Sequence, residues 1–259
     1  MSDIVEVEHD GAIATVVLNR PDKLNAINKA MWQAVGDVFS ALGGDPSIRC
    51  IVLRGAGEKA FSPGADIAEF GSVRADVSQA TVYGGLMHRA MGAIGSCPHP
   101  TLAAIRGICV GGGLELAAMC DLRICGVSSR FGVPISRIGV VMAYPEIRAL
   151  IALVGEAAAL EILFEGRVFG AEEAHEKRLV NRVVADDAVW AEAAEAARRI
   201  AEGAPLVNQW HKKFARRIRD GRPLTPAEAE EGFAAFGTDD YREGIRAFLA
   251  KDKPRFTGR

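Results

Sequence analysis

The residues with the clearest chemical potential are three consecutive glycines, Gly111–Gly113, followed two positions later by Glu115. An apolar stretch leads into them, and we expect a helix to begin directly after them. Glycines leave backbone amides uncovered, and the first amides of a helix have no acceptor within it. Such amides can bind an oxyanion, and a nearby Glu115 carboxylate can transfer a proton beside an activated carbonyl. The residue types also allow a purely structural interpretation: a glycine turn for close strand–helix packing, with Glu115 complementing the helix dipole.

A second glycine-containing segment, Phe61–Ile67, follows another predicted strand. Its small side chains at 62, 64 and 65 leave room for a ligand, and it could bring the Ala65 amide to the same point. Alone this signal is weak, because Pro-Gly is often only a turn. A dinucleotide fingerprint fits poorly, since the glycines are not spaced as GxGxxG and no acidic residue follows at the expected distance.

Strands and helices alternate in the first part of the chain. Short β-branched or apolar runs predict strands over 12–19, 48–54, 101–108 and 121–126, and Asn28 can cap the helix that follows it. This alternation favours mostly parallel pairing. From residue 187 onward the pattern is helical, over 187–202 and 206–220 and then in two further helices capped by Thr225 and Thr238, the last ending at Pro254.

Composition limits the class of protein. The chain has 259 residues, 49% hydrophobic and 25% charged, which excludes an intrinsically disordered protein. Its net charge of −2 gives no general electrostatic reason for a nucleic-acid or membrane partner. The five cysteines show no CxxC pair, and neither a signal peptide nor a long apolar run is evident. We therefore expect a cytoplasmic protein without disulfides or a metal site.

Five segments taken together, in this order and spacing, resemble the crotonase family, also called the enoyl-CoA hydratase/isomerase family: Asn19–Ala26, Phe61–Ile67, Gly107–Asp121, Phe131–Pro134 and Gly244–Leu249. The resemblance covers essentially the whole chain. It implies an α/β fold, a spiral of ββα units over 1–185, with a helical trimerisation region over 186–259. It also implies an acyl-CoA substrate, no separate cofactor, and a homo-oligomer that is a trimer or a dimer of trimers.

The resemblance assigns roles to particular residues. The amides of Ala65 and Gly112 match the family's oxyanion hole, and Glu115 matches one of its two catalytic glutamates. Asp66 is expected to cap a loop, and Lys23 either pairs with a CoA phosphate or is an ordinary surface lysine. The expected substrate-binding positions are Lys23, Leu24, Ala26, Gly64, Ala65, Asp66, Ile67, Gly111, Gly112, Pro134 and Ile135.

One departure from the family pattern bears on activity. The second family glutamate would follow the Phe-Gly-x-Pro segment, where this chain has Ile135. Tyr144 or Glu146 could supply the missing proton-transfer group, although each could equally be a packing or loop residue. His88 is a weaker candidate, and its neighbours Met87 and Met91 favour a structural role. The sequence predicts 2-enoyl-CoA hydration by default, with isomerase, decarboxylase, thioester hydrolase or a catalytically impaired CoA-binding protein as alternatives.

A basic run between His211 and Arg222 contains six lysines and arginines. It predicts a helix with a solvated or subunit-facing surface. The overall charge, which is close to zero, argues against nucleic-acid binding through this helix.

Overall fold

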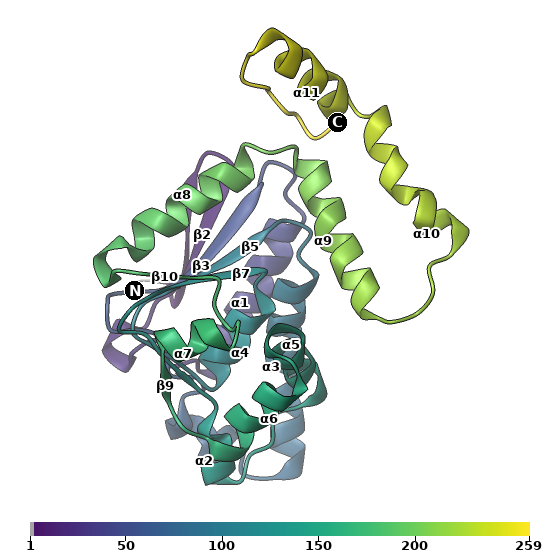
Figure 1. Cartoon of the computed structure of the whole chain (residues 1–259). Coiled ribbons are helices and arrows are strands. Elements are labelled where there is room, and N and C mark those ends of the chain that lie inside the picture. The colour runs from purple at the N-terminus through teal and green to yellow at the C-terminus, as the bar shows by residue number, and fades with distance from the viewer. Residues whose placement is uncertain (1–2) are drawn as a thin grey trace.

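The computed structural model describes residues 3–259, which form two β-sheets surrounded by helices (Figure 1). The larger sheet has the strand order β1-β2-β3-β5-β7-β10. All its neighbours run parallel except the antiparallel pair β1–β2. Its strands are β1 (Val5–Asp10), β2 (Ile13–Leu18), β3 (Cys50–Gly55), β5 (Thr101–Ile105), β7 (Leu122–Gly126) and β10 (Arg182–Val184). The predicted α/β class and the mostly parallel pairing are confirmed.

The larger sheet is buried on both faces. In β3, Ile51 and Leu53 belong to the main hydrophobic core, whereas the alternate residues Cys50 and Val52 belong to a second cluster. Side chains of a strand point alternately to opposite faces, so an apolar run suits a strand covered on both sides. Helix α8 (Val189–Ala201) packs against the second cluster. Helix α1 (Lys29–Gly43), capped by Asn28 as predicted, and α3 (Val77–Ser96) contribute to the main core.

A second, four-stranded sheet has the order β4-β6-β8-β9. Its strands are β4 (Ala60–Ser62), β6 (Ile108–Val110), β8 (Arg130–Gly132) and β9 (Phe169–Gly170). The prediction of one strand over 101–108 was wrong, because the chain leaves β5 and turns into β6 in the other sheet. Gly107 makes this turn with φ +63°, and a Cβ there would lie 1.9 Å from the Lys59 carbonyl oxygen. The turn places the end of β6 directly before the triple glycine.

The remaining helices of the body are α2 (Phe70–Val73), α4 (Gly112–Met119), α5 (Tyr144–Val154), α6 (Glu156–Glu165) and α7 (Ala171–Glu176). Helix α4 begins at the triple glycine, as predicted. Within residues 3–259, no helix is both long and apolar enough to cross a membrane.

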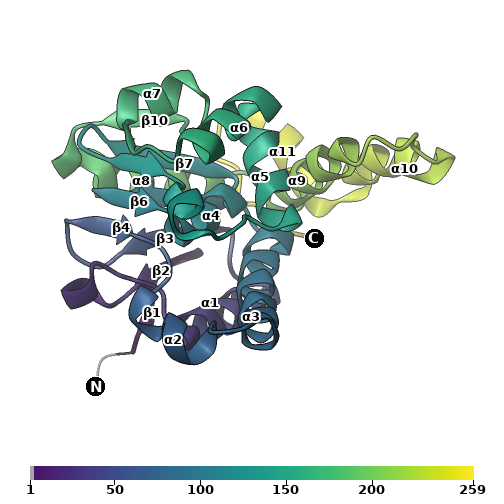
Figure 2. The ribbon, with the colours of Figure 1, turned by 90° about the horizontal axis from the view of Figure 1, so that it is seen from below.

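The C-terminal helices α9 (Pro205–Arg219), α10 (Pro226–Glu230) and α11 (Asp239–Ala250) extend away from the body as an arm (Figure 2). Thr225 forms a capping box with Glu228, and Thr238 caps α11, both as predicted. Pro254 does not end the last helix. Helix α11 ends at Ala250, and Lys251 follows in the left-handed region with φ 56°. Because α8 packs on the sheet, only the helices after it leave the body.

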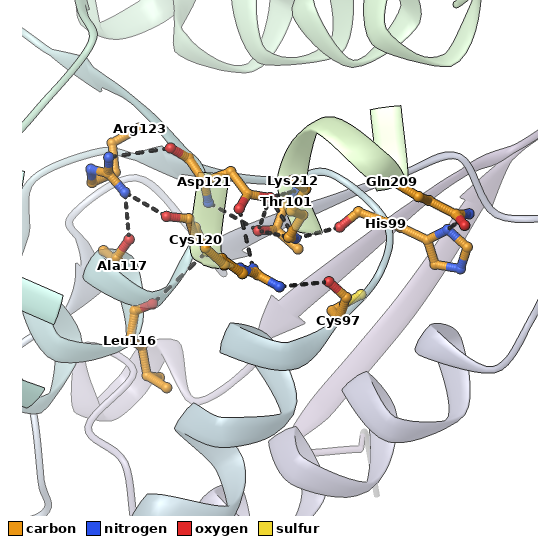
Figure 3. A network of polar contacts seen from close by, with 11 residues as sticks. Cys97, His99, Thr101, Leu116, Ala117, Cys120, Asp121, Arg123, Gln209 and Lys212 are labelled. Carbon is orange, nitrogen blue, oxygen red and sulfur yellow. Dashed lines mark hydrogen bonds and ion pairs between the residues drawn. The ribbon is translucent and has the colours of Figure 1, made fainter. Parts of the chain in front are cut away.

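Helix α9 is fastened to the body by a buried ion pair (Figure 3). The Lys212 ammonium lies 2.5 Å from Asp121 Oδ2 and donates to the His99 carbonyl at 2.5 Å. Arg216, one turn later, donates to the Cys97 carbonyl and to Asp121 Oδ1. Burial lowers the pKa of Lys212, and Asp121 opposes this effect. The prediction of a solvated basic helix is therefore wrong at this face of α9, where the cations hold the arm to the body.

Replacing Lys212 by methionine is expected to destabilise the fold by about 2 kcal/mol, because the buried His99 carbonyl loses its ammonium donor and Asp121 is left with Arg216 as its ion-pair partner. Lys213→Met is a matched control: its side chain is 61% exposed and pairs with Glu231 at the surface. A change there should stay within about 0.5 kcal/mol. Urea unfolding measures both, and equal midpoints for the two variants would contradict the anchoring role.

Candidate active site

The two predicted oxyanion donors lie together. Ala65 follows β4, and Gly112 is the first residue of α4. A Cβ placed on Gly112 would lie 3.5 Å from the Ala65 nitrogen, and one placed on Gly64 would lie 2.9 Å from the Gly112 nitrogen. Among the described residues neither amide donates a hydrogen bond to a protein acceptor. The fold therefore leaves two neighbouring N–H groups available for one ligand oxygen.

Several backbone contacts hold these two segments in place. Ile27 donates to the Gly64 carbonyl at 2.8 Å and accepts from Asp66 N at 2.9 Å. These bonds leave Ala65, between them, without a partner. Gly111, at φ +53°, donates to the Gly132 carbonyl at 2.9 Å. Pairing on both sides of Ala65, and directly before Gly112, thus holds the two segments without using either amide.

The segment expected at the CoA end is folded against the oxyanion loop. The buried Asn25 donates to the carbonyls of Ala56 and Ala60, at 2.9 and 2.8 Å. Arg20 donates to the Ala26 carbonyl at 2.7 Å and pairs with Asp66 at 3.0 Å. The Asp66 carboxylate also accepts from Ala68 N, so it caps the loop as predicted. Of the other expected substrate-binding residues, Lys23 and Ile67 are exposed, Leu24, Ala26, Pro134 and Ile135 are partly buried, and Gly64, Gly111 and Gly112 are buried.

Glu115 lies in the first turn of α4 with only 7% of its surface exposed. Its Oε2 is buried and has no hydrogen-bond partner among the described residues. Burial, and secondarily the negative charge of Glu146, raises the pKa of Glu115 to about 7, while Arg74 opposes the shift. A carboxyl group with a pKa near neutrality can exchange a proton under physiological conditions. The burial and the raised pKa of Glu115 fit the proton-transfer role expected for this residue.

The second carboxylate at this site is Glu146. It lies in the first turn of α5, which packs against α4, and it is 3% exposed. Its negative charge contributes to the raised pKa of Glu115, in keeping with the packing of α5 against α4. The alternative, Tyr144, is 88% exposed and lies outside this buried site. Ile135 packs at the edge of the main core, as its apolar side chain requires. Burial of Glu146 at the start of a helix could not be predicted from its neighbours.

Sequence reasoning missed a group of side chains beside the oxyanion donors. Trp32 lies against Gly112, since a Cβ on that glycine would be 3.2 Å from its ring. The indole N–H donates to the Tyr83 hydroxyl at 2.9 Å, and Arg74 stacks on the Tyr83 ring. Trp32 carried the usual signal of a core residue at helical spacing, and nothing distinguished it as part of a site.

Two cavities of the chain lie elsewhere. They have volumes of about 290 and 990 Å³ and share a lining of C-terminal residues, Lys253, Pro254 and Arg255. Neither cavity is lined by Ala65, Gly112 or Glu115, so the candidate site residues lie apart from both cavities. Among residues 3–259, no three or more His, Cys, Asp and Glu side chains are grouped as a metal site requires.

The sequence profile of "Enoyl-CoA hydratase/isomerase" matches residues 8–259. The chain belongs to the enoyl-CoA hydratase/isomerase family. A "Probable enoyl-CoA hydratase" of Rhizobium meliloti is 36% identical over 98% of this chain and 97% of its own. A "Crotonyl-CoA hydratase" of Syntrophomonas wolfei is 32% identical over 96% of each chain.

The same family appears among solved structures. An "enoyl-CoA hydratase/carnithine racemase" from Magnetospirillum magneticum is 52% identical, covers 100% of this chain and 97% of its own, and superposes with a TM-score of 0.98. The family resemblance found in the sequence and the crotonase-like α/β fold that it implied are thereby confirmed.

Proposed function

We propose that this enzyme adds water to the double bond of a 2-enoyl-CoA thioester. The observation that carries the proposal is the pair of buried carboxylates, Glu115 and Glu146, on the packed helices α4 and α5, together with the unpaired Gly112 amide at the start of α4 and the Ala65 amide beside it. Ala65 and Gly112 would hold the thioester oxygen as it becomes an enolate, and each such donor contributes about 3 to 4 kcal/mol in the transition state.

The two carboxylates can divide the proton transfers. Burial raises the pKa of Glu115 to about 7, so Glu115 holds its proton up to about that pH and can act as the acid, which leaves the role of base to Glu146. Glu146 would take a proton from water as the oxygen bonds to the β-carbon, and Glu115 would give its proton to the α-carbon. The bond between the α- and β-carbons becomes single, and the atoms of one water are added. Glu146 would thus take the role of the second family glutamate, whose position in the sequence is occupied by Ile135.

Glu146→Gln tests this assignment. Glutamine keeps the size of the side chain but cannot accept the proton, so hydration should slow by about 10² to 10³-fold. Glu156→Gln is the control, because Glu156 occupies the first turn of the next helix and is exposed. The rate is measured by mass spectrometry, as the mass gain of one water on enoyl-CoA substrates of several chain lengths. Full activity of Glu146→Gln would contradict its role as base.

The same screen separates the remaining activities. Loss of carbon dioxide, release of free CoA, or a shifted double bond without mass change would indicate a decarboxylase, a thioester hydrolase or an isomerase. Binding of acyl-CoA without turnover would indicate a binding protein. The second carboxylate favours hydration over all of these.

We further propose a homo-oligomer, a trimer or a dimer of trimers, formed through the C-terminal arm. The arm exposes large apolar side chains that water does not favour: Phe233, Phe236, Ile245, Phe248 and Leu249. Light scattering after size exclusion gives the assembly mass, and a monomer at micromolar concentration would contradict this.

The five cysteines are buried and free, which supports a reducing compartment, and we propose the cytoplasm.

A further inference from the structure

His88 contacts the carboxylate that the proposed mechanism uses as a base. Its Nε2 lies 3.1 Å from Glu146 Oε1, joining α3 to α5. The Glu146 side chain is 3% exposed, whereas the His88 side chain is 43% exposed. Neither carboxylate oxygen has an aligned hydrogen bond among the described residues. His88 thus contacts a buried, otherwise unpartnered carboxylate on one side and water on the other.

Hydration leaves the two carboxylates in the wrong protonation states for another cycle. Glu146 has gained a proton from water, and Glu115 has given one to the substrate. Before the next turnover, Glu146 must lose its proton and Glu115 must regain one. A carboxyl group that is 3% exposed exchanges protons with bulk water poorly, so resetting the site needs an intermediate group. An imidazole suits this task, because one ring nitrogen can accept a proton while the other releases one.

We propose that His88 is the positioning residue of Glu146 and its route for protons to and from solvent. This inference rests on the proposed function. His88 would hold Oε1 toward α3 during the addition, then accept the proton from Glu146 and pass it to water. His88 acts through Glu146 and does not touch the substrate.

The charged groups around this pair are consistent with the role. The negative charge of Glu146 raises the pKa of Glu115 on α4, and the positive charge of Arg74, after α2, lowers it. Arg89, next to His88 on α3, pairs instead with Asp37 of α1 and does not compete for Glu146. The chain also offers no other ion-pair partner for Glu146 among its described residues. Among the described residues, His88 is therefore the one basic titratable group within ion-pair distance of Glu146.

Two substitutions separate holding from relay. His88→Gln can still offer an N–H to Glu146 but cannot pass a proton on, so the first turnover should be fast and later turnovers about tenfold slower. His88→Ala loses both functions, and added imidazole should restore its activity in a saturable way. Rapid-quench assays with crotonyl-CoA measure the first and later turnovers. Arg89→Ala, on the same helix, serves as the control and should keep the wild-type rates.

The outcomes distinguish this inference from the proposed function. Normal steady-state turnover by His88→Gln would overturn the relay, as would equal slowing of first and later turnovers. Imidazole that fails to raise the activity of His88→Ala would also overturn it. If Glu146→Gln is inactive in any of these cases, the hydration mechanism stands without His88. If Glu146→Gln is fully active, the mechanism itself fails.

Discussion

Glu115→Gln is expected to lower kcat/KM for enoyl-CoA hydration by about 10² to 10⁴-fold, the usual contribution of a general acid. Glutamine fits the same buried space beside the oxyanion donors but cannot deliver a proton to the α-carbon. Exposed Glu156→Gln is again the matched control. Unchanged turnover of every accepted acyl-CoA would remove Glu115 from the mechanism.

The pH dependence of the wild-type enzyme reports the same group. Glu115 must be protonated to act as the acid in hydration, so kcat/KM should fall as pH rises through about 7. In the reverse reaction, dehydration of the 3-hydroxyacyl-CoA, the ionised Glu115 takes the proton from the α-carbon. That rate should therefore rise through the same pH. Profiles measured in both directions test the assignment, and two profiles of the same sign would contradict it.

Folding stability gives a third readout of Glu115. Its pKa is raised from an ordinary 4.5 to about 7 by folding, so the native state favours the protonated form. The wild-type protein should lose stability as pH rises from about 4.5 to about 7. Glutamine cannot ionise. Glu115→Gln should therefore match wild type near pH 4 and exceed its unfolding free energy by about 3 kcal/mol above pH 7. Loss of activity combined with this gain in stability is unlike the effect of a damaged core.

The two glycine segments could be found in the sequence because a close approach of backbone to backbone or ligand requires residues without a side chain. Glycines at 64 and 111–113 mark places where side chains must be absent, and the order of strand, glycines and Glu115 fixed the start of α4. Gly107 carried the same type of signal, yet the turn it makes between two sheets was missed. A single glycine in an apolar run does not indicate whether the strand bends, forms a bulge or ends there.

The second carboxylate and the basic helix show what local pattern cannot supply. Tyr144 and Glu146 were equal candidates, since their depth depends on how α5 packs on α4. Lys212 appeared to be one of six surface cations, and its burial depends on Asp121, which is 91 positions earlier in the chain. Such charges are placed by long-range packing, which residue spacing along one helix does not encode.

Gly64→Ala is expected to lower kcat/KM by about 10² to 10³-fold, the loss typical of one oxyanion donor. Gly64 has φ +100°, and an added Cβ would lie 2.9 Å from the Gly112 nitrogen and 3.0 Å from the Val110 carbonyl oxygen. The methyl group would cover the Gly112 N–H and push the two segments apart. Because an L-residue is strained at this φ, we also expect a stability loss of about 1 to 3 kcal/mol.

Gly85→Ala separates the site effect from a general effect of replacing glycine. Gly85 lies in α3, has no atom within 4 Å of an added Cβ, and should gain up to about 1 kcal/mol from helix propensity. Its activity should remain at the wild-type level. Thermal unfolding shows that Gly64→Ala is still folded at the assay temperature, and kcat/KM is then measured on the folded protein. A folded Gly64→Ala with normal kcat/KM would mean that the Gly112 amide does not bind the thioester oxygen, and the two amides would then serve only to pack β4 against α4.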